Sequence, residues 1–125
     1  MNISDVLNFP SFYEYIKKEK MDIKTAYILT LIKKEVDFHL EFYQTELNEI
    51  LSKYAQKDKN GNYIKTPDNL GISILPNCQE DCKKEVQDLL NLEITYSAPY
   101  LELSNFDNLK ISPELLESIL PFMKI

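Results

Sequence analysis

The sequence predicts an α+β fold that is mainly helical, with one long helix, shorter helices packed against it and a small antiparallel β-hairpin or sheet. Three observations support this prediction. No glycine or proline interrupts residues 22–60, and apolar residues recur there at helical spacing. Two short segments after residue 91 alternate apolar and polar residues with the period of a strand. The 125 residues fit one domain, 1–125.

A short first helix is expected over Phe12–Lys20, entered through Phe9-Pro10-Ser11. The long helix is expected over about Ile23–Ala55, with Asp22 as its N-cap. Its apolar seam advances in steps of 4, 3, 4, 3 and 4 residues along Val36, Leu40, Tyr43, Leu47, Ile50 and Tyr54. Such a helix is roughly 50 Å long, whereas a domain of this size is about 30 Å across. We therefore expect one end to project or to pack against another chain.

Turns and short elements are expected after the long helix. Asn60-Gly61 is a strong turn signal, and residues 63–64 and 72–75 have the character of short strands. A third helix is expected over about 77–91, and residues 92–96 and 100–103 are predicted to form a hairpin. The last helix is expected to begin at Ser112 as N-cap with Pro113 as its first residue.

Charge and composition exclude several classes of partner. The chain has 14 basic and 20 acidic residues, a net charge of −6, and every basic residue apart from its one histidine is a lysine. We therefore expect no direct binding to nucleic acid or to an anionic membrane, because both depend on clustered cations. Two glycines are too few for a glycine-rich phosphate loop. The chain also lacks an apolar run of about 20 residues and an export signal. The expected location is the cytoplasm.

Cys78, Cys82 and His39 are the residues closest to a chemical site. The two cysteines lie four residues apart on one face of the third helix and would supply half of a zinc site, but no second pair of ligands accompanies them. His39 lacks a recognisable nucleophile beside it. Asp58, Asn60 and Asn62 resemble the start of a calcium loop, yet Gly61 falls at the wrong position. We therefore predict no catalytic, metal-binding or cofactor-binding residues, and no cofactor.

A protein-binding surface is the expected functional feature. Tyrosine and phenylalanine are frequent in interfaces, and the chain has eight and six of them. The long helix also carries many carboxylates, which form either a solvated face or a surface for a basic partner. The residues predicted to contact a partner are Glu35, Phe38, Glu41, Phe42, Tyr43, Glu46 and Glu49.

Three features resemble small uncharacterised proteins of phages and prophages of Gram-positive bacteria. They are Tyr54-Ala55 followed by Asp58 and Gly61, the run Leu89-Leu90-Asn91-Leu92-Glu93-Ile94, and a leucine-rich tail. The likeness covers about residues 24–122. It implies a viral or prophage setting, with a location in the host cell cytoplasm or a virion, and carries no activity to any residue. Cys78, Cys82 and the tyrosine-rich N-terminal helix depart from the pattern.

The leading hypothesis is a small non-enzymatic accessory protein of the phage type that acts through protein–protein contacts, with itself or with a host or virion protein, and that forms homo-oligomers through the long helix. The first alternative is an inhibitor of a host defence nuclease, similar in action to an anti-CRISPR protein, that uses its acidic surface. The second alternative is an enzyme or metal protein that uses Cys78, Cys82 and His39.

Overall fold

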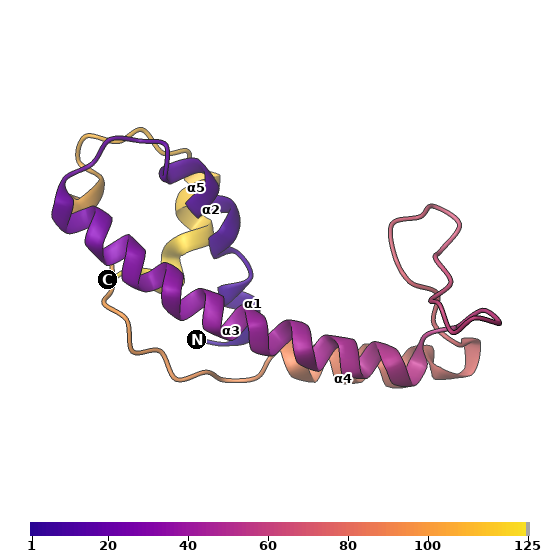
Figure 1. The fold of residues 1–125 in the computed structure, drawn as a ribbon. Coiled ribbons are helices and arrows are strands. Elements are labelled where there is room, and N and C mark those ends of the chain that lie inside the picture. Colours follow the sequence, from indigo (N-terminus) through magenta and orange to yellow (C-terminus); the bar gives the residue numbers. More distant parts are fainter. Residues whose placement is uncertain (125) are drawn as a thin grey trace. The chain divides into compact units, whose positions relative to one another are not determined.

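The computed structural model describes residues 1–124 and is mainly helical (Figure 1). Its α-helices are α1 (Ile3–Val6), α2 (Phe9–Ile16), α3 (Ile23–Tyr54), α4 (Gln79–Leu90) and α5 (Pro113–Ile119). Single 3₁₀ turns cover Pro76–Cys78, Leu103–Phe106 and Leu120–Phe122. No helix in the described part of the chain combines the length and the apolar character needed to cross a membrane. The chain divides into two compact units, Met1–Glu41 with Leu92–Ile125 and Phe42–Asn91. The single-domain expectation stays a prediction.

The long helix is confirmed almost to the residue. α3 runs without a break over 32 residues from Ile23 to Tyr54, which corresponds to about 48 Å at 1.5 Å per residue. Asp22 caps its first turn, because the carboxylate Oδ1 accepts a hydrogen bond of 2.8 Å from the amide of Thr25. Residues 23–41 belong to the first unit and residues 42–54 to the second.

The cap at Asp22 gives α3 a stability that depends on pH. Hydrogen bonds donated to the Asp22 carboxylate by the Thr25 side chain and then by the Thr25 backbone amide hold the pKa of Asp22 below its ordinary value of 3.8. A lowered carboxylate pKa stabilises the fold above the unfolded-state pKa, and this stability is lost as the pH falls through the folded-state pKa. We therefore expect Asp22→Ala to lower the melting temperature by a few degrees at neutral pH and much less under strongly acidic conditions. Asp22→Asn keeps an oxygen acceptor and serves as the control; an equal loss for both variants would contradict the capping role.

The first unit is built around an aromatic core. Phe9, Phe12 and Phe122 are fully buried, with ring centroids 6.1 Å apart for Phe9 and Phe12 and 5.3 Å apart for Phe9 and Phe122. α3 faces this core with Leu29, Ile32 and Val36, which recur at helical spacing. Further core positions come from Val6, Ile16, Leu101, Phe106, Ile119 and Met123.

The second unit continues the same apolar seam. Tyr43, Leu47, Ile50 and Tyr54 of α3 pack with residues of α4 and of the loop before it, namely Cys82, Val86, Leu89 and Ile74. The seam predicted from the spacing 4, 3, 4, 3, 4 is thus the buried face of α3 in each unit. Apolar side chains on the other faces of α3 lie outside both cores.

Residues 55–75 close into a ring of backbone hydrogen bonds. Gln56 N donates to Ser73 O over 2.8 Å, Ser73 N donates to Ile64 O over 2.7 Å, and Ile64 N donates to Gln56 O over 3.0 Å. Three short extended segments therefore pair with one another in isolated bridges, without a regular strand. The turn predicted at Asn60-Gly61 is present: Asp58 Oδ1 accepts from the amides of Asn60 and Asn62, and Gly61 has a φ of 81°.

The predicted β-hairpin over residues 92–103 is wrong, as is the small sheet: no β-sheet occurs within residues 1–124. Neither predicted strand forms: each segment instead makes an isolated bridge to a segment near an end of the chain, Glu93 to Asn2 and Leu101 to Met123. Ile3 N donates to Leu92 O and Ile94 N to Met1 O, both over 3.1 Å, while Leu101 N donates to Phe122 O over 2.9 Å. Alternation identifies an extended segment but not its partner.

The shorter helices differ from the prediction in where they begin and end. The first was expected over Phe12–Lys20, but α2 begins at Phe9 with Pro10 in its first turn and ends at Ile16, and α1 was missed. The third was expected from Asn77, whereas a 3₁₀ turn precedes α4. The last helix is confirmed: Ser112 Oγ accepts from the amide of Leu115 over 3.2 Å, and Pro113 is the first helical residue.

Candidate protein-binding site

α3 carries an exposed apolar stripe in the first unit. Ile23 is 88% exposed, Tyr27 is 64% exposed and Phe38 is 69% exposed. Leu31, which lies between Tyr27 and Phe38 in the sequence, is half-buried. At 100° per residue these four side chains fall within an arc of about 80°. Leu29, Ile32 and Val36, which face the core, lie on the opposite side of the helix. We call Ile23, Tyr27, Leu31 and Phe38 the α3 stripe.

The stripe exists because α3 carries apolar residues on two of its sides. A surface helix normally shows one apolar face and one polar face. Here one face is satisfied by the core of its own unit, and the second presents large side chains that contribute nothing to that core. Lys34 lies within the arc of the stripe, between Leu31 and Phe38, and Phe42, 41% exposed, follows Phe38 by one turn.

The predicted partner-binding residues lie in different environments. Phe38 and Phe42 are exposed, Tyr43 is half-buried against the core of the second unit, and Glu41 is exposed. Glu46 and Glu49 line a groove of about 540 Å³ in the second unit. The structure therefore does not bring all seven residues into one patch. Ile23, Tyr27 and Leu31 were missed, although their spacing from Phe38 places them on the side opposite the seam.

Glu35 is engaged within the first unit. Its Oε1 accepts from the amide of Ser97 over 3.1 Å and lies 3.3 Å from His39 Nε2, and its Oε2 accepts from Ser97 Oγ over 3.3 Å. The carboxylate lies between the hydroxyl and the imidazole, whereas in a serine-hydrolase triad the imidazole contacts the hydroxyl. This arrangement fastens the 92–100 segment to α3.

The two cysteines differ in their burial. Cys82 is buried in the core of the second unit, and burial, followed by the nearby Glu85 carboxylate, raises the pKa of its thiol. Cys78 is partly exposed, and its Sγ donates to Asn77 Oδ1 over 3.5 Å. Within residues 1–124 no three histidine, cysteine, aspartate or glutamate side chains gather where they could hold a metal ion.

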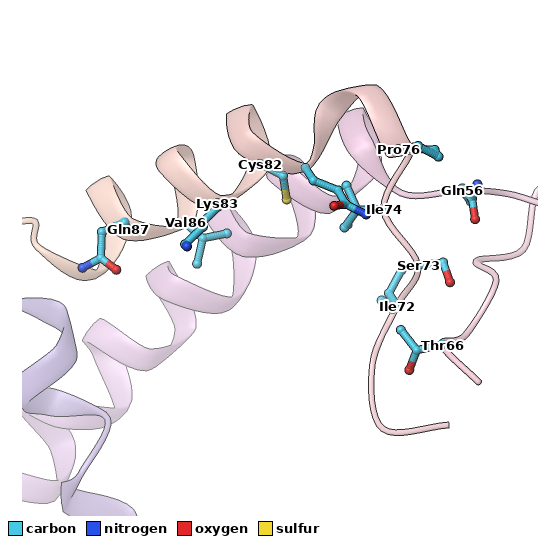
Figure 2. A pocket seen from close by; sticks show the side chains of 11 residues that line it. Gln56, Thr66, Ile72, Ser73, Ile74, Pro76, Cys82, Lys83, Val86 and Gln87 are labelled. Atoms are coloured by element: carbon cyan, nitrogen blue, oxygen red, sulfur yellow. The ribbon is translucent and has the colours of Figure 1, made fainter. Parts of the chain in front are cut away.

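A groove of the second unit lies between α4 and the loop before it (Figure 2). Its volume is about 610 Å³. Cys82, Lys83 and Val86 reach it from α4, and Ile72 and Ile74 reach it from the loop. Polar groups are added by the amide side chains of Gln56, Gln79 and Gln87. The groove holds few charged groups and is open to solvent.

A polar cluster joins α3 to α4 inside the second unit. Lys53 Nζ contacts Glu85 Oε1 over 2.5 Å, and the Tyr54 phenol hydrogen-bonds to the same side chain. The bonds from Lys53 and then Tyr54 lower the pKa of Glu85, so this contact stabilises the fold above the ordinary glutamate pKa and is lost on acidification through the folded-state pKa.

Replacing Glu85 by glutamine should change the titration of Tyr54. The hydrogen bond to the Glu85 carboxylate, followed by burial, raises the pKa of Tyr54 to about 12 from 10.0. We expect the Tyr54 pKa to fall back toward 10.0 in Glu85→Gln, because the neutral amide no longer favours the protonated phenol. The measurement is a pH titration followed by NMR of the tyrosine ring carbons. Lys53→Met keeps the carboxylate and should leave the Tyr54 pKa raised; an unchanged pKa in Glu85→Gln would refute the assignment.

Comparison with known proteins adds no relative: no family model, no curated protein and no solved structure matches the chain. The candidate site is therefore defined by its own geometry.

Proposed function

We propose that this protein is a non-enzymatic binding protein that docks onto another protein through the α3 stripe. The exposure of Ile23, Tyr27 and Phe38 on one side of one helix carries the proposal. Burial of one such side chain is worth about 1.5–3 kcal/mol, so an exposed group of them favours association. Aromatic residues are also the ones that most often dominate the free energy of binding in interfaces.

The rigidity of the stripe supports the proposal. Its side chains project from an unbroken helix whose opposite face is packed into the core of the first unit. Side chains held on a packed helix lose less conformational entropy on binding than side chains on a loop. The accessory role and the phage-type setting predicted from the sequence are part of the same proposal.

A photo-crosslinker at position 38 tests this function directly. Replacing Phe38 by a photoreactive phenylalanine in the cell that makes the protein should give a covalent adduct with a second polypeptide. Leu103 is also 69% exposed and belongs to the same unit but lies outside α3, so the same replacement there is the matched control. Adducts at position 38 and not at position 103 are expected. Failure of both positions to give an adduct, or equal adducts at both, would contradict docking through the stripe.

A second candidate function is favoured by the acidic groove of the second unit. Four carboxylates line it together with a single lysine, and they are Glu46, Glu49, Glu85 and Asp88. Such a groove suits a basic partner, and the function that uses it is inhibition of a host defence nuclease whose nucleic-acid channel is basic. The test is cleavage by an RNA-guided nuclease with and without the protein. Inhibition should weaken when salt is added, and it should also weaken in the double variant Glu46→Lys/Glu49→Lys. Cleavage that the wild-type protein does not affect would rule out this candidate.

A further inference from the structure

Asn60 is followed by a glycine, and no other asparagine of this chain is. The backbone nitrogen of Gly61 and the side-chain carbon Cγ of Asn60 are connected so that a bond between them closes a five-membered ring. Glycine lacks a Cβ, so other atoms can approach its backbone closely. A side chain on the following residue crowds such a ring, as that of Tyr63 does after Asn62. The Asn60-Gly61 pair is therefore the most reactive asparagine position in the sequence.

Solvent reaches both reacting groups of this pair. Residues 57–65 are all exposed, and beyond the adjoining residues no atom lies within 4 Å of the place where a Cβ on Gly61 would stand. The backbone amide of Asn60 is engaged, but within residues 1–124 no hydrogen bond holds its side-chain amide. This side chain is thus free to turn toward Gly61, and water and hydroxide have access to both groups.

Asp58 holds the turn around Asn60 closed. Its Oδ1 accepts hydrogen bonds from the amide of Asn60 over 2.9 Å and from the amide of Asn62 over 3.0 Å. Its backbone oxygen accepts from the Gly61 amide over 3.1 Å. The Gly61 amide proton must leave before its nitrogen can attack Cγ, so the closed turn opposes the reaction. A short exposed turn opens locally at low free-energy cost, so the reaction is slowed rather than prevented.

We propose that Asn60 is a site of spontaneous deamidation and that Asp58 slows this modification by holding the turn closed. Base removes the Gly61 amide proton, the nitrogen bonds to Cγ of Asn60, and the bond from Cγ to Nδ2 breaks. The Nδ2 nitrogen takes up a proton and leaves as ammonia, and a cyclic imide remains. Water then opens the imide at one of its two carbonyl carbons. Cleavage at Cγ gives aspartate, and cleavage at the backbone carbonyl carbon gives isoaspartate; no atom is oxidised or reduced.

Both products alter the second unit. A carboxylate at position 60 lies near that of Asp58, and the two repel each other. In isoaspartate the backbone runs through the side-chain carbons and is one atom longer. This longer link lies between Asp58 and Asn62, which pair through a hydrogen bond of 2.9 Å from the amide of Asp58 to the carbonyl of Asn62. The modification therefore loosens the backbone pairing of residues 55–75 as the protein ages.

Peptide mass spectrometry of the full folded chain, incubated over weeks at several neutral and mildly alkaline pH values, tests the proposal. Chymotryptic cleavage after Tyr54 and Tyr63 releases peptide 55–63, which contains Asn60 and Asn62 together. We expect the mass gain of an NH₂-to-OH exchange at Asn60, with isoaspartate separated by chromatography and a rate that rises with pH. The rate at Asn60 should exceed that at Asn62 at least about tenfold, a barrier lower by about 1.4 kcal/mol or more.

Variants separate the reaction from its restraint. Asn60→Gln keeps the amide but requires a larger ring, so its peptide should keep its mass. Asp58→Ala removes the Oδ1 acceptor and should raise the rate at Asn60 by about fivefold or more. Asp58→Asn keeps an oxygen acceptor and should react at Asn60 at nearly the wild-type rate. No mass gain at Asn60, equal rates at Asn60 and Asn62, or the same rate at Asn60 in Asp58→Ala and Asp58→Asn would overturn the proposal.

Discussion

Replacing Phe12 by alanine should lower the free energy of unfolding of the first unit by about 3–5 kcal/mol. Phe12 is fully buried, and its ring meets Phe9 and Phe106 with centroids 6.1 Å away in each case. Truncation removes the apolar contacts of the ring and leaves a cavity that the surrounding aromatic side chains fill only in part. Total stability for a chain of this size is about 5–15 kcal/mol, so the expected loss is a large share of it.

Denaturant unfolding followed by circular dichroism measures this loss. Phe38→Ala deletes the same atoms from an exposed position on α3 and is the matched control, with an expected change of about 0.5 kcal/mol or less. Similar losses of unfolding free energy in the two variants would contradict the description of Phe12 as a buried core residue and Phe38 as an exposed one.

Introducing proline at Thr30 should destabilise α3 by about 3 kcal/mol or more. Thr30 is exposed, so the effect comes almost entirely from the backbone. The amide at position 30 donates to the carbonyl of Ala26 in an uninterrupted α-helix, and proline removes that donor and clashes with the same carbonyl. Because the neighbouring Leu29 and Ile32 lie in the core, a bend at this point also disturbs the packing of the first unit.

Thr30→Ala separates the backbone effect from loss of the side chain. It removes only the hydroxyl, which donates to the Ala26 carbonyl over 2.8 Å, and it places a better helix former at an exposed position. We expect its melting temperature to equal or slightly exceed that of the wild type, while Thr30→Pro melts far lower. A Thr30→Pro variant as stable as wild type would mean that α3 is already interrupted near this residue.

The main helix could be predicted from the sequence because its signals are local. A capping aspartate, the absence of glycine and proline, and a regular apolar seam all lie within the helix itself, and each is present as expected. The last helix was predictable for the same reason, since Ser112 and Pro113 mark its beginning within two residues. The α2 boundary was not, because Pro10 was interpreted as preceding the helix when proline fits equally well in a first turn.

Pairing between distant segments could not be predicted. Residues 92–94 pair with the first residues of the chain, and Leu101 pairs with the segment around Met123. Neither partner shows an alternating pattern, so each strand was paired with the alternating segment nearest to it along the chain. The role of Glu35 was hidden for the same reason, since nothing in its neighbourhood points to Ser97, 62 residues further along the chain.

The candidate site was only partly foreseen. Phe38 and Phe42 stood out as aromatics off the apolar seam, and both are exposed. Ile23, Tyr27 and Leu31, on the same side of α3, were not predicted to contact a partner, because a sequence does not show how wide a face the core will cover. The structure shows where the buried face of α3 ends: Ile32 is fully buried, while Leu31 beside it is half-buried.

Photo-crosslinking from position 38 tests the central claim most directly, namely that the α3 stripe is a docking surface. We predict that a photoreactive phenylalanine at position 38 gives a covalent adduct with a second polypeptide, while the same residue at position 103, where Leu103 is equally exposed in the same unit, gives none. No adduct at position 38, or equal adducts at both positions, would contradict the account.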